Sequence, residues 1–181
     1  MTDRFFSELK RELQQGVHKK GHSFRYGTLA TVGLETMPRL RTVVLRKVSE
    51  DLKLTFFTDK RSKKLIHIKE NNKVSMLFYD PKQLLQVKVE GLANSISDAP
   101  ILKKYWNAVQ PNSRKDYTTA HAPGSSISNP DKVDYLNDEN YFCILEIEPF
   151  RIEYLKLKRP NHLRVQFSKK EGEWVGEFLV P

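Results

Sequence analysis

The sequence predicts a mainly β protein, a barrel with peripheral α-helices that is α+β overall. Short apolar runs with strand-like alternation recur from residue 25 to the C-terminus, separated by turn residues, whereas only three stretches have helical spacing. About eight strands with few helices are typical of an all-β barrel with helical additions. With 181 residues, 39% of them hydrophobic, and no repeat or boundary, we expect one domain spanning residues 1–181.

The N-terminal segment predicts an amphipathic helix followed by a strand. Apolar residues recur at three- and four-residue spacing from residue 3 to about residue 19, and Asp3 is the expected cap. Residues 21–24 break this pattern. The run RYGTLATVGL, residues 25–34, then has the composition of a strand, in which Gly27 marks a bulge or a close backbone approach.

Residues 39–64 form the centre of the predicted fold. RTVVLRKV (residues 41–48) is β-branched and apolar in its middle, with cations at both ends, and LKLTFFT (residues 52–58) alternates as a second strand. The polar residues 49–51 make a turn between them, so we expect an antiparallel hairpin. The cations at the strand ends indicate an anionic group nearby.

The segment DKRSKK, residues 59–64, leaves this hairpin and predicts an anion site. Ser62 is a good N-cap, and the apolar residues behind it have helical spacing. Arg61, Lys63 and Lys64 therefore crowd the positive end of a helix dipole, which is unfavourable unless something negative neutralises them. A phosphate fits, because free N–H groups, a hydroxyl and cations could converge on it. A solvated basic turn is the alternative interpretation.

Two further strands follow this helix. They are predicted over residues 74–79 and 84–92, and the turn DPK joins them. Every second residue of the latter strand is polar, which fits a face exposed to solvent or one that lines a site. These polar residues are Gln86, Lys88 and Glu90.

The C-terminal half combines one helix, a long loop and several strands. Asp98 caps an amphipathic helix over residues 99–109. Residues 110–133 have little apolar content and much Pro, Gly, Ser and Asn, so we expect either a functional lid or a disordered loop. The remaining strand-like runs are residues 141–150, 151–158 and 162–169, followed by a short C-terminal hairpin.

The composition excludes several classes of protein. No signal peptide or membrane-length apolar run is present, so we expect a soluble, cytoplasmic protein. The single cysteine, Cys143, excludes an internal disulfide and a clustered-cysteine zinc site, and its apolar neighbours indicate a packed thiol rather than a nucleophile. The five histidines lack metal-ligand spacing, and there is no P-loop, nucleophile elbow or Rossmann glycine motif.

The net charge of +9 agrees with an anionic ligand. It also agrees with nucleic-acid binding, although the basic residues are spread along the chain and no zinc-finger or RRM motif is present. A barrel with a cationic phosphate site at its strand ends suits a phosphorylated cofactor that carries the chemistry itself.

Several pieces of the chain resemble the pyridoxamine 5′-phosphate oxidase-like family, the FMN-binding split β-barrels. These pieces are LATVGLETMPRLR, RTVVLR (residues 41–46), FFTDKRSKK (residues 56–64) and VSMLFYDPKQLLQVKVEG (residues 74–91). They follow the family's order and spacing. The resemblance implies a split β-barrel, FMN as the cofactor and a homodimer that shares its cofactor sites.

The resemblance also assigns residues to the cofactor. Arg41 matches the arginine on the FMN phosphate, the strand backbone after it would lie along the flavin, and Lys63 replaces an arginine of the family's basic motif. Gln86 matches a glutamine that reaches the flavin, often from the other subunit. The implied cofactor residues are Arg41, Thr42, Val43, Val44, Leu45, Arg46, Phe57, Thr58, Ser62, Lys63, Lys64, Gln86 and Ser125.

The substrate end departs from the family's pattern. The candidate substrate residues are Arg46, Tyr105, Ser113 and Arg164, of which Arg46 replaces a lysine. Val109 stands where the substrate phosphate needs an arginine. Further departures are Leu155 at a tryptophan, Gln166 at an arginine, and His162-Leu-Arg164 at a motif with Arg and His.

These departures predict a relative that is a poor pyridoxamine 5′-phosphate oxidase. We expect an FMN-dependent oxidoreductase in which the flavin accepts a hydride from a small, anionic substrate, and no residue is named as catalytic. One alternative is a carrier or sensor that binds flavin or tetrapyrrole without turnover. A basic nucleic-acid-binding barrel is the other alternative.

Overall fold

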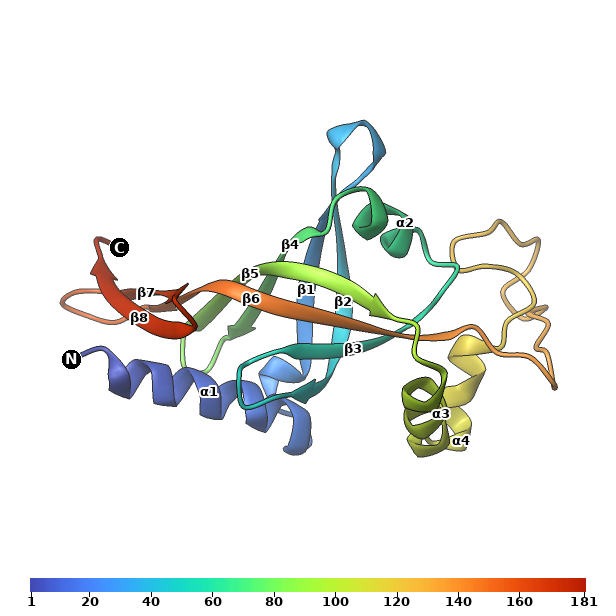
Figure 1. Ribbon diagram of the computed structural model, residues 1–181, viewed down its shortest axis with the longest axis horizontal. Coiled ribbons are helices and arrows are strands. Elements are labelled where there is room, and N and C mark those ends of the chain that lie inside the picture. Colours follow the sequence, from blue (N-terminus) through green and yellow to red (C-terminus); the bar gives the residue numbers. More distant parts are fainter.

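Eight antiparallel strands dominate the computed structural model, which describes residues 1–181 (Figure 1). Their order in the sheet is β3-β2-β1-β4-β5-β6-β7-β8, and pairing of β3 with β6 closes the first six strands into a barrel, as expected. The strands are β1 (Tyr26–Val32), β2 (Pro38–Val48), β3 (Leu54–Asp59), β4 (Lys73–Asp80), β5 (Leu85–Ile96), β6 (Phe142–Lys156), β7 (Leu163–Lys170) and β8 (Glu173–Leu179).

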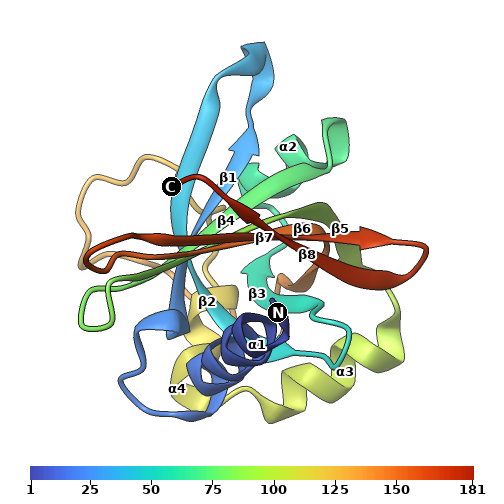
Figure 2. The same ribbon diagram turned by 90° about the vertical axis from the view of Figure 1, so that its left-hand side faces the viewer.

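The helices lie around this barrel. Helix α1 packs across one side of it, and α2 lies on the opposite side beside the β1–β2 hairpin (Figures 1 and 2). No helix is long and apolar enough to cross a membrane. The predicted cap of α1 is wrong, because Thr2 is its N-cap and Asp3 is its first residue. The helices are α1 (Asp3–His18), α2 (Lys63–Glu70), α3 (Ala99–Ala108) and α4 (Pro111–Arg114).

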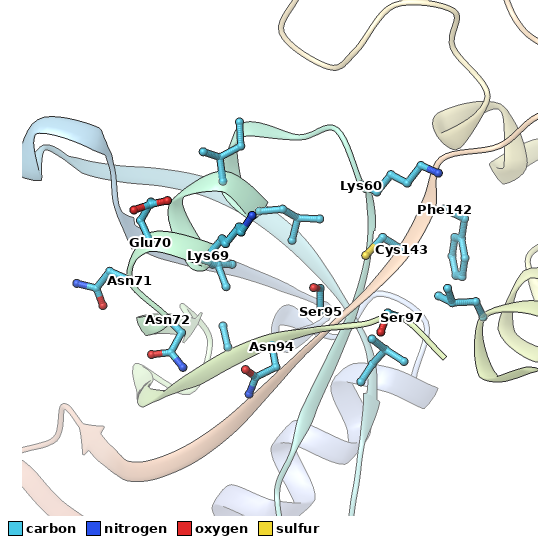
Figure 3. A pocket seen from close by; sticks show the side chains of 16 residues that line it. Lys60, Lys69, Glu70, Asn71, Asn72, Asn94, Ser95, Ser97, Phe142 and Cys143 are labelled. Carbon is cyan, nitrogen blue, oxygen red and sulfur yellow. The ribbon is translucent and has the colours of Figure 1, made fainter. Parts of the chain in front are cut away.

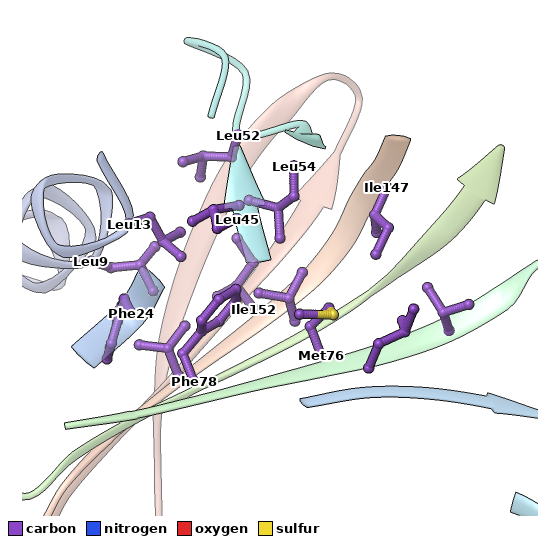
Figure 4. Packing of buried hydrophobic residues seen from close by; sticks show 14 of the residues in the cluster. Leu9, Leu13, Phe24, Leu45, Leu52, Leu54, Met76, Phe78, Ile147 and Ile152 are labelled. Carbon is purple, nitrogen blue, oxygen red and sulfur yellow. The ribbon is translucent and has the colours of Figure 1, made fainter. Parts of the chain in front are cut away.

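The main core fills the barrel and continues under α1. Leu9 and Leu13 of α1 are fully buried and lie beside Leu45 of β2 in the same cluster (Figure 4). This packing explains the three- and four-residue spacing of the N-terminal segment, because it puts one apolar stripe on the barrel. A burial of this kind stabilises the fold by about 1.5–3 kcal/mol for each fully buried leucine.

Strand β6 corrects the predicted C-terminal pattern. Residues 141–150 and 151–158 were expected to be separate strands, but Phe142–Lys156 is continuous. The ladder with β5 pairs Gly91 with Pro149 and Glu90 with Arg151, so one extra residue forms a bulge. Proline cannot donate to a ladder and is tolerated at such a bulge. One half of β6 therefore closes the barrel against β3, and the other half carries the β7–β8 hairpin.

The long loop contains more secondary structure than the sequence indicates. Helix α4 and a 3-10 turn (Lys115–Tyr117) occupy its start, and Thr119 pairs with Tyr135. A second, smaller core holds it to β6, and it consists of Val109, Tyr117, Phe142 and Ile144. Cys143 lies buried beside this core, and burial raises the pKa of its thiol, as expected of a packed cysteine.

Strands β2 and β3 separate part of the way along the hairpin. The predicted hairpin is confirmed, with Val48 opposite Leu54 and Leu45 opposite Phe56. Beyond Phe56, β3 pairs with β6 alone, while residues 38–44 of β2 pair with β1 alone. The other edge of residues 38–44 therefore has no strand partner, and its backbone N–H and C=O groups face the split.

Candidate functional site

Five cationic or titratable side chains gather where β1 and β2 meet α2. We call this group the cation cluster, and it consists of Arg39, Arg41, Lys63, Lys64 and His67. None of its members forms an ion pair. Converging positive charges without a carboxylate are costly for the free protein and favour an anionic ligand.

Arg41 enters the cluster from the inner face of β2. It pairs with buried Leu29, so the two side chains share one face of the sheet. Its guanidinium donates hydrogen bonds to the Thr31 hydroxyl at 2.7 Å and to the Leu29 carbonyl at 3.3 Å. Both acceptors are neutral, and burial lowers the pKa of Arg41. The arginine is held in place without being neutralised.

Lys64 enters the cluster from the first turn of α2. Ser62 is the N-cap residue, as predicted, but its hydroxyl does not cap the helix. It accepts a hydrogen bond at 2.7 Å from Lys64 Nζ, which also donates to Thr58 Oγ1 at 2.9 Å. Burial lowers the pKa of Lys64, and the charge of Arg41 lowers it further. The first N–H groups of α2 have no intrahelical acceptor, so these donors lie at the same helix end as Lys63 and Lys64.

His67 is a member that the sequence analysis missed. It lies one turn after Lys64 and is buried, and its Nδ1 is 3.2 Å from the Thr31 hydroxyl. The same hydroxyl accepts from Arg41, so Thr31 links Arg41 and His67 through hydrogen bonds. Burial lowers the pKa of His67, as do the charges of Arg41, Arg39 and Lys63. Helical spacing from Lys64 was the only signal in the sequence.

A cavity of about 500 Å³ adjoins the cluster. Arg39, Arg41, Lys63 and His67 line it, and Glu35 is the one acidic residue in its wall. The nearest buried carboxylate, Asp59, is bound by Arg61 on both of its oxygens. The cavity can therefore hold a small dianion such as a phosphate.

The open edge of β2 leads away from the cluster. Arg46 stands at the irregularity where β2 and β3 separate, with its guanidinium 5.3 Å from the centre of the Phe57 ring. Its Nε is buried without a hydrogen-bond partner. An unpaired donor and an unpaired strand edge next to an anion site suit a flat, polar ring attached to a phosphate. The residues present therefore fit FMN.

Other predicted cofactor residues lie elsewhere in the chain. Gln86 pairs with Tyr79 and Leu155, and two strands separate it from β2 in the sheet order. Ser125 is exposed and lines a separate cavity of about 290 Å³ within the long loop. The structure thus brings together Arg41, Thr58, Ser62, Lys63 and Lys64, but it does not bring Gln86 or Ser125 to them within one chain.

The candidate substrate residues are spread over several elements. Tyr105 stacks edge-on with Phe57, and its hydroxyl is 3.5 Å from Lys47 Nζ. Val109 is buried in the second core, and Ser113 is half-buried in α4. Arg164 donates to buried Glu153 at 2.8 Å.

The C-terminal departures also occupy structural positions. His162 Nδ1 accepts from the backbone N–H of Lys158, and Gln166 donates to Glu177. Leu155 lies on β6 opposite Gln86 and Arg164. These side chains serve local hydrogen bonding and packing within the chain.

A larger cavity, of about 770 Å³, lies on the other side of α2 (Figure 3). Asn71, Asn72 and Asn94 contribute amides to it, and Phe142 and Cys143 lie at the β6 side. Its residues come from segments far apart in the sequence, so no motif marked it. No group of three or more His, Cys, Asp or Glu side chains is placed to hold a metal ion.

Comparison with known proteins gives a family match. The sequence model described as "Pyridoxamine 5′-phosphate oxidase, FMN-binding domain" matches residues 4–97. A pyridoxine/pyridoxamine 5′-phosphate oxidase from Aliarcobacter butzleri is 42% identical over 78 residues, which are 43% of this chain and 36% of that protein. A putative pyridoxamine 5′-phosphate oxidase from Caenorhabditis elegans is 30% identical over 154 residues, 85% of this chain and 60% of that protein. The match therefore spans less than two thirds of either relative.

Solved structures agree with this assignment. A pyridoxamine 5′-phosphate oxidase-related FMN-binding protein from Nostoc punctiforme superposes with a TM-score of 0.80 at 25% identity, covering 97% of this chain and 96% of that one. PhzG from Burkholderia lata, solved with tetrahydrophenazine-1-carboxylic acid, shares the fold with a TM-score of 0.76 at 16% identity, covering 99% and 90%. The chain therefore belongs to the pyridoxamine 5′-phosphate oxidase-like family of split β-barrels, and its cofactor is FMN.

Proposed function

We propose that this chain is a homodimeric FMN-dependent oxidoreductase whose substrate is a small anion other than pyridoxamine 5′-phosphate. The observation that carries the proposal is the cation cluster, which has no carboxylate partner and lies at one end of the open β2 edge. Bound FMN would supply hydride and electron transfer. The residues of the chain would bind it, orient it and place charge beside it.

The FMN phosphate would bind at the cation cluster. Arg41 and Lys64 are held by neutral oxygens, so both can turn a charged donor to the phosphate without breaking an ion pair. Ser62, Lys63 and the first N–H groups of α2 would complete the site. Charge-assisted contacts of this kind contribute about 1.5–3 kcal/mol each.

The flavin ring would lie along residues 42–45 of β2. The unpaired backbone groups of residues 42–44 can match the alternating donors and acceptors on the edge of the ring, and Phe57 and Thr58 would lie beside the ribityl chain. Arg46 would hold a positive charge next to the ring. This charge would stabilise the negative charge that a flavin carries when it is reduced. None of these residues has to transfer a proton itself.

The dimer would form through the outer face of β1, β2 and β4. Lys73 lies at one end of this face, and most of the other outward-pointing residues on these strands carry no charge. They are Tyr26, Thr28, Ala30, Val32, Leu40, Thr42, Val44, Ser75, Leu77 and Tyr79. Gln86 borders this face because it pairs with Tyr79. A two-fold contact through it would offer Gln86 of one chain to the flavin of the other.

The substrate would differ from pyridoxamine 5′-phosphate because one charged anchor is missing and another is engaged within the chain. Val109 stands where the resemblance expects an arginine on the substrate phosphate. It carries no charge and is buried among aromatic residues, so this position offers the substrate no cation. Arg164 is engaged by Glu153, which neutralises it. Arg46 is the cation that remains near the ring for an anionic substrate.

We expect Arg41→Ala to weaken FMN binding by about ten- to a hundredfold, because one charge-assisted phosphate contact is lost. Riboflavin is the matched ligand control, since it keeps the ring and lacks the phosphate, and its affinity should change little. Flavin fluorescence quenching measures both. Equal FMN affinity in wild type and variant would show that the phosphate lies elsewhere.

We expect FMN binding to become tighter as the pH falls, through His67. The pKa of His67 is lowered in the free protein, and a phosphate beside it would raise that pKa, so the complex takes up a proton between the two values. The ratio of wild-type to His67→Gln affinity should therefore rise between about pH 8 and pH 6. Taking the ratio cancels the titration of FMN itself, and a ratio independent of pH would contradict the assignment.

We expect light scattering to report about twice the 21.1 kDa chain mass. Leu77→Arg puts a charge at the centre of the outer face and should yield monomers that bind FMN more weakly. Ile101→Arg is the control, because this residue is similarly exposed but lies on α3. A monomeric wild type that still holds FMN would rule out the shared site.

We expect very slow oxidation of pyridoxamine or pyridoxine 5′-phosphate by the FMN-loaded protein. One missing charged anchor removes about 2–3 kcal/mol of substrate binding, a factor of roughly 30–150 in affinity. Hydrogen peroxide and pyridoxal phosphate are the products to follow. Turnover typical of a dedicated oxidase would contradict the role given to Val109, and a bound flavin that NADH, NADPH and small amines all fail to reduce would favour a carrier.

A further inference from the structure

Arg61 makes more polar contacts than any other side chain near the cation cluster. It lies in the turn between β3 and α2, with its side chain 19% exposed. Its Nε and NH2 groups donate to the two carboxylate oxygens of Asp59 at 3.1 and 2.7 Å. Asp59 is itself 4% exposed, so this is a two-pronged and largely buried ion pair.

The same guanidinium reaches across to the long loop. It donates to the Ala120 carbonyl at 3.1 Å and to the Thr119 carbonyl at 2.9 Å, and it stacks 3.3 Å from the centre of the Tyr141 ring. Thr119 and Ala120 are far from Arg61 in sequence, and they pair with residues 134–135 on the return of the loop. Arg61 therefore joins the turn of the anion site to both arms of the loop.

Asp59 is a potential competitor for the cation cluster. Its negative charge acts on Lys64, which has only neutral hydrogen-bond acceptors. A buried carboxylate that lost its arginine would attract another cation within its reach, because an unpaired buried charge is unfavourable. Lys64 would then form an ion pair and be less available to a ligand.

From these contacts we infer that Arg61 is a positioning residue with two roles. It neutralises Asp59, so that Lys64 stays available for the ligand phosphate, and it holds residues 118–136 against the turn between β3 and α2. The first role rests on the proposed binding of FMN, whereas the second concerns the free chain and can be tested without any flavin.

The first role is tested by FMN affinity in three variants. Arg61→Ala should weaken binding roughly tenfold, as expected when one charge-assisted contact is impaired. Adding Asp59→Asn to it removes the competing carboxylate and should return the affinity to within about threefold of wild type. Arg61→Lys keeps the positive charge beside Asp59 and should also bind nearly as tightly as wild type.

The second role is tested by limited trypsin digestion of the flavin-free protein, with cleavage after Lys132 followed by mass spectrometry. Arg61→Ala and the double variant should be cut faster than wild type. Arg61→Lys should be cut faster as well, because an ammonium lacks the planar fork that holds two carbonyls and a carboxylate together. In Arg61→Lys and in the double variant, FMN affinity should therefore stay near that of wild type while cleavage becomes faster.

Lys60→Ala is the control for charge, since Lys60 is exposed, adjacent in sequence and also near the Tyr141 ring. It should leave both measurements unchanged. Wild-type affinity in Arg61→Ala, or a double variant as weak as Arg61→Ala, overturns the first role. Wild-type cleavage in Arg61→Ala overturns the second.

If Arg61→Ala does not fold, Arg61→Lys and the double variant carry the same tests, because neither leaves a carboxylate unpaired. If the wild type binds no FMN, the proposed function fails while the digestion result still decides the loop role.

Discussion

The separation of β3 from β2 is the constraint on which the rest of the structure depends. After Phe56, β3 exchanges one neighbour for another and closes the barrel against β6, which leaves residues 38–44 of β2 unpaired on one side. An open edge within a barrel is costly unless something covers it. The same separation leads the chain from β3 into the turn at residues 59–64 and into α2. The unpaired backbone of β2 and the cations at the start of α2 therefore have the same structural origin.

The side chains of the cation cluster repel one another in the free protein. Burial and mutual repulsion disfavour the charged forms of Lys64 and His67, and Arg41 is desolvated next to them. Such a site is less stable than a neutral one, and an anion relieves the repulsion when it binds. Arg61 keeps the nearest carboxylate occupied, so the repulsion is not relieved from within the chain.

The elements that local chemistry determines were predictable from the sequence. The β2–β3 hairpin, the N-cap role of Ser62 and the Asp98 cap, which accepts from Ile101 at 2.9 Å, follow from residues close together in the chain. The continuity of β6 was not predictable, because Pro149 reads as a break until its bulge opposite Gly91 is seen. Residues joined only through the fold, such as Arg61 and the long loop, leave no pattern in sequence.

One half of the candidate site could also be predicted, because its residues lie close together in the sequence. The proposed phosphate side comes from contiguous segments within residues 4–97, the part that the family sequence model matches. The proposed substrate side would involve α3 and the long loop, which lie beyond residue 97, together with the second core, in which Val109 is buried against aromatic residues. A barrel that fixes the cofactor through one set of elements leaves another free to change substrate, because the two are packed by separate cores. On this proposal cofactor binding and substrate choice can vary separately, and substrate choice depends on side chains that only the folded chain brings together.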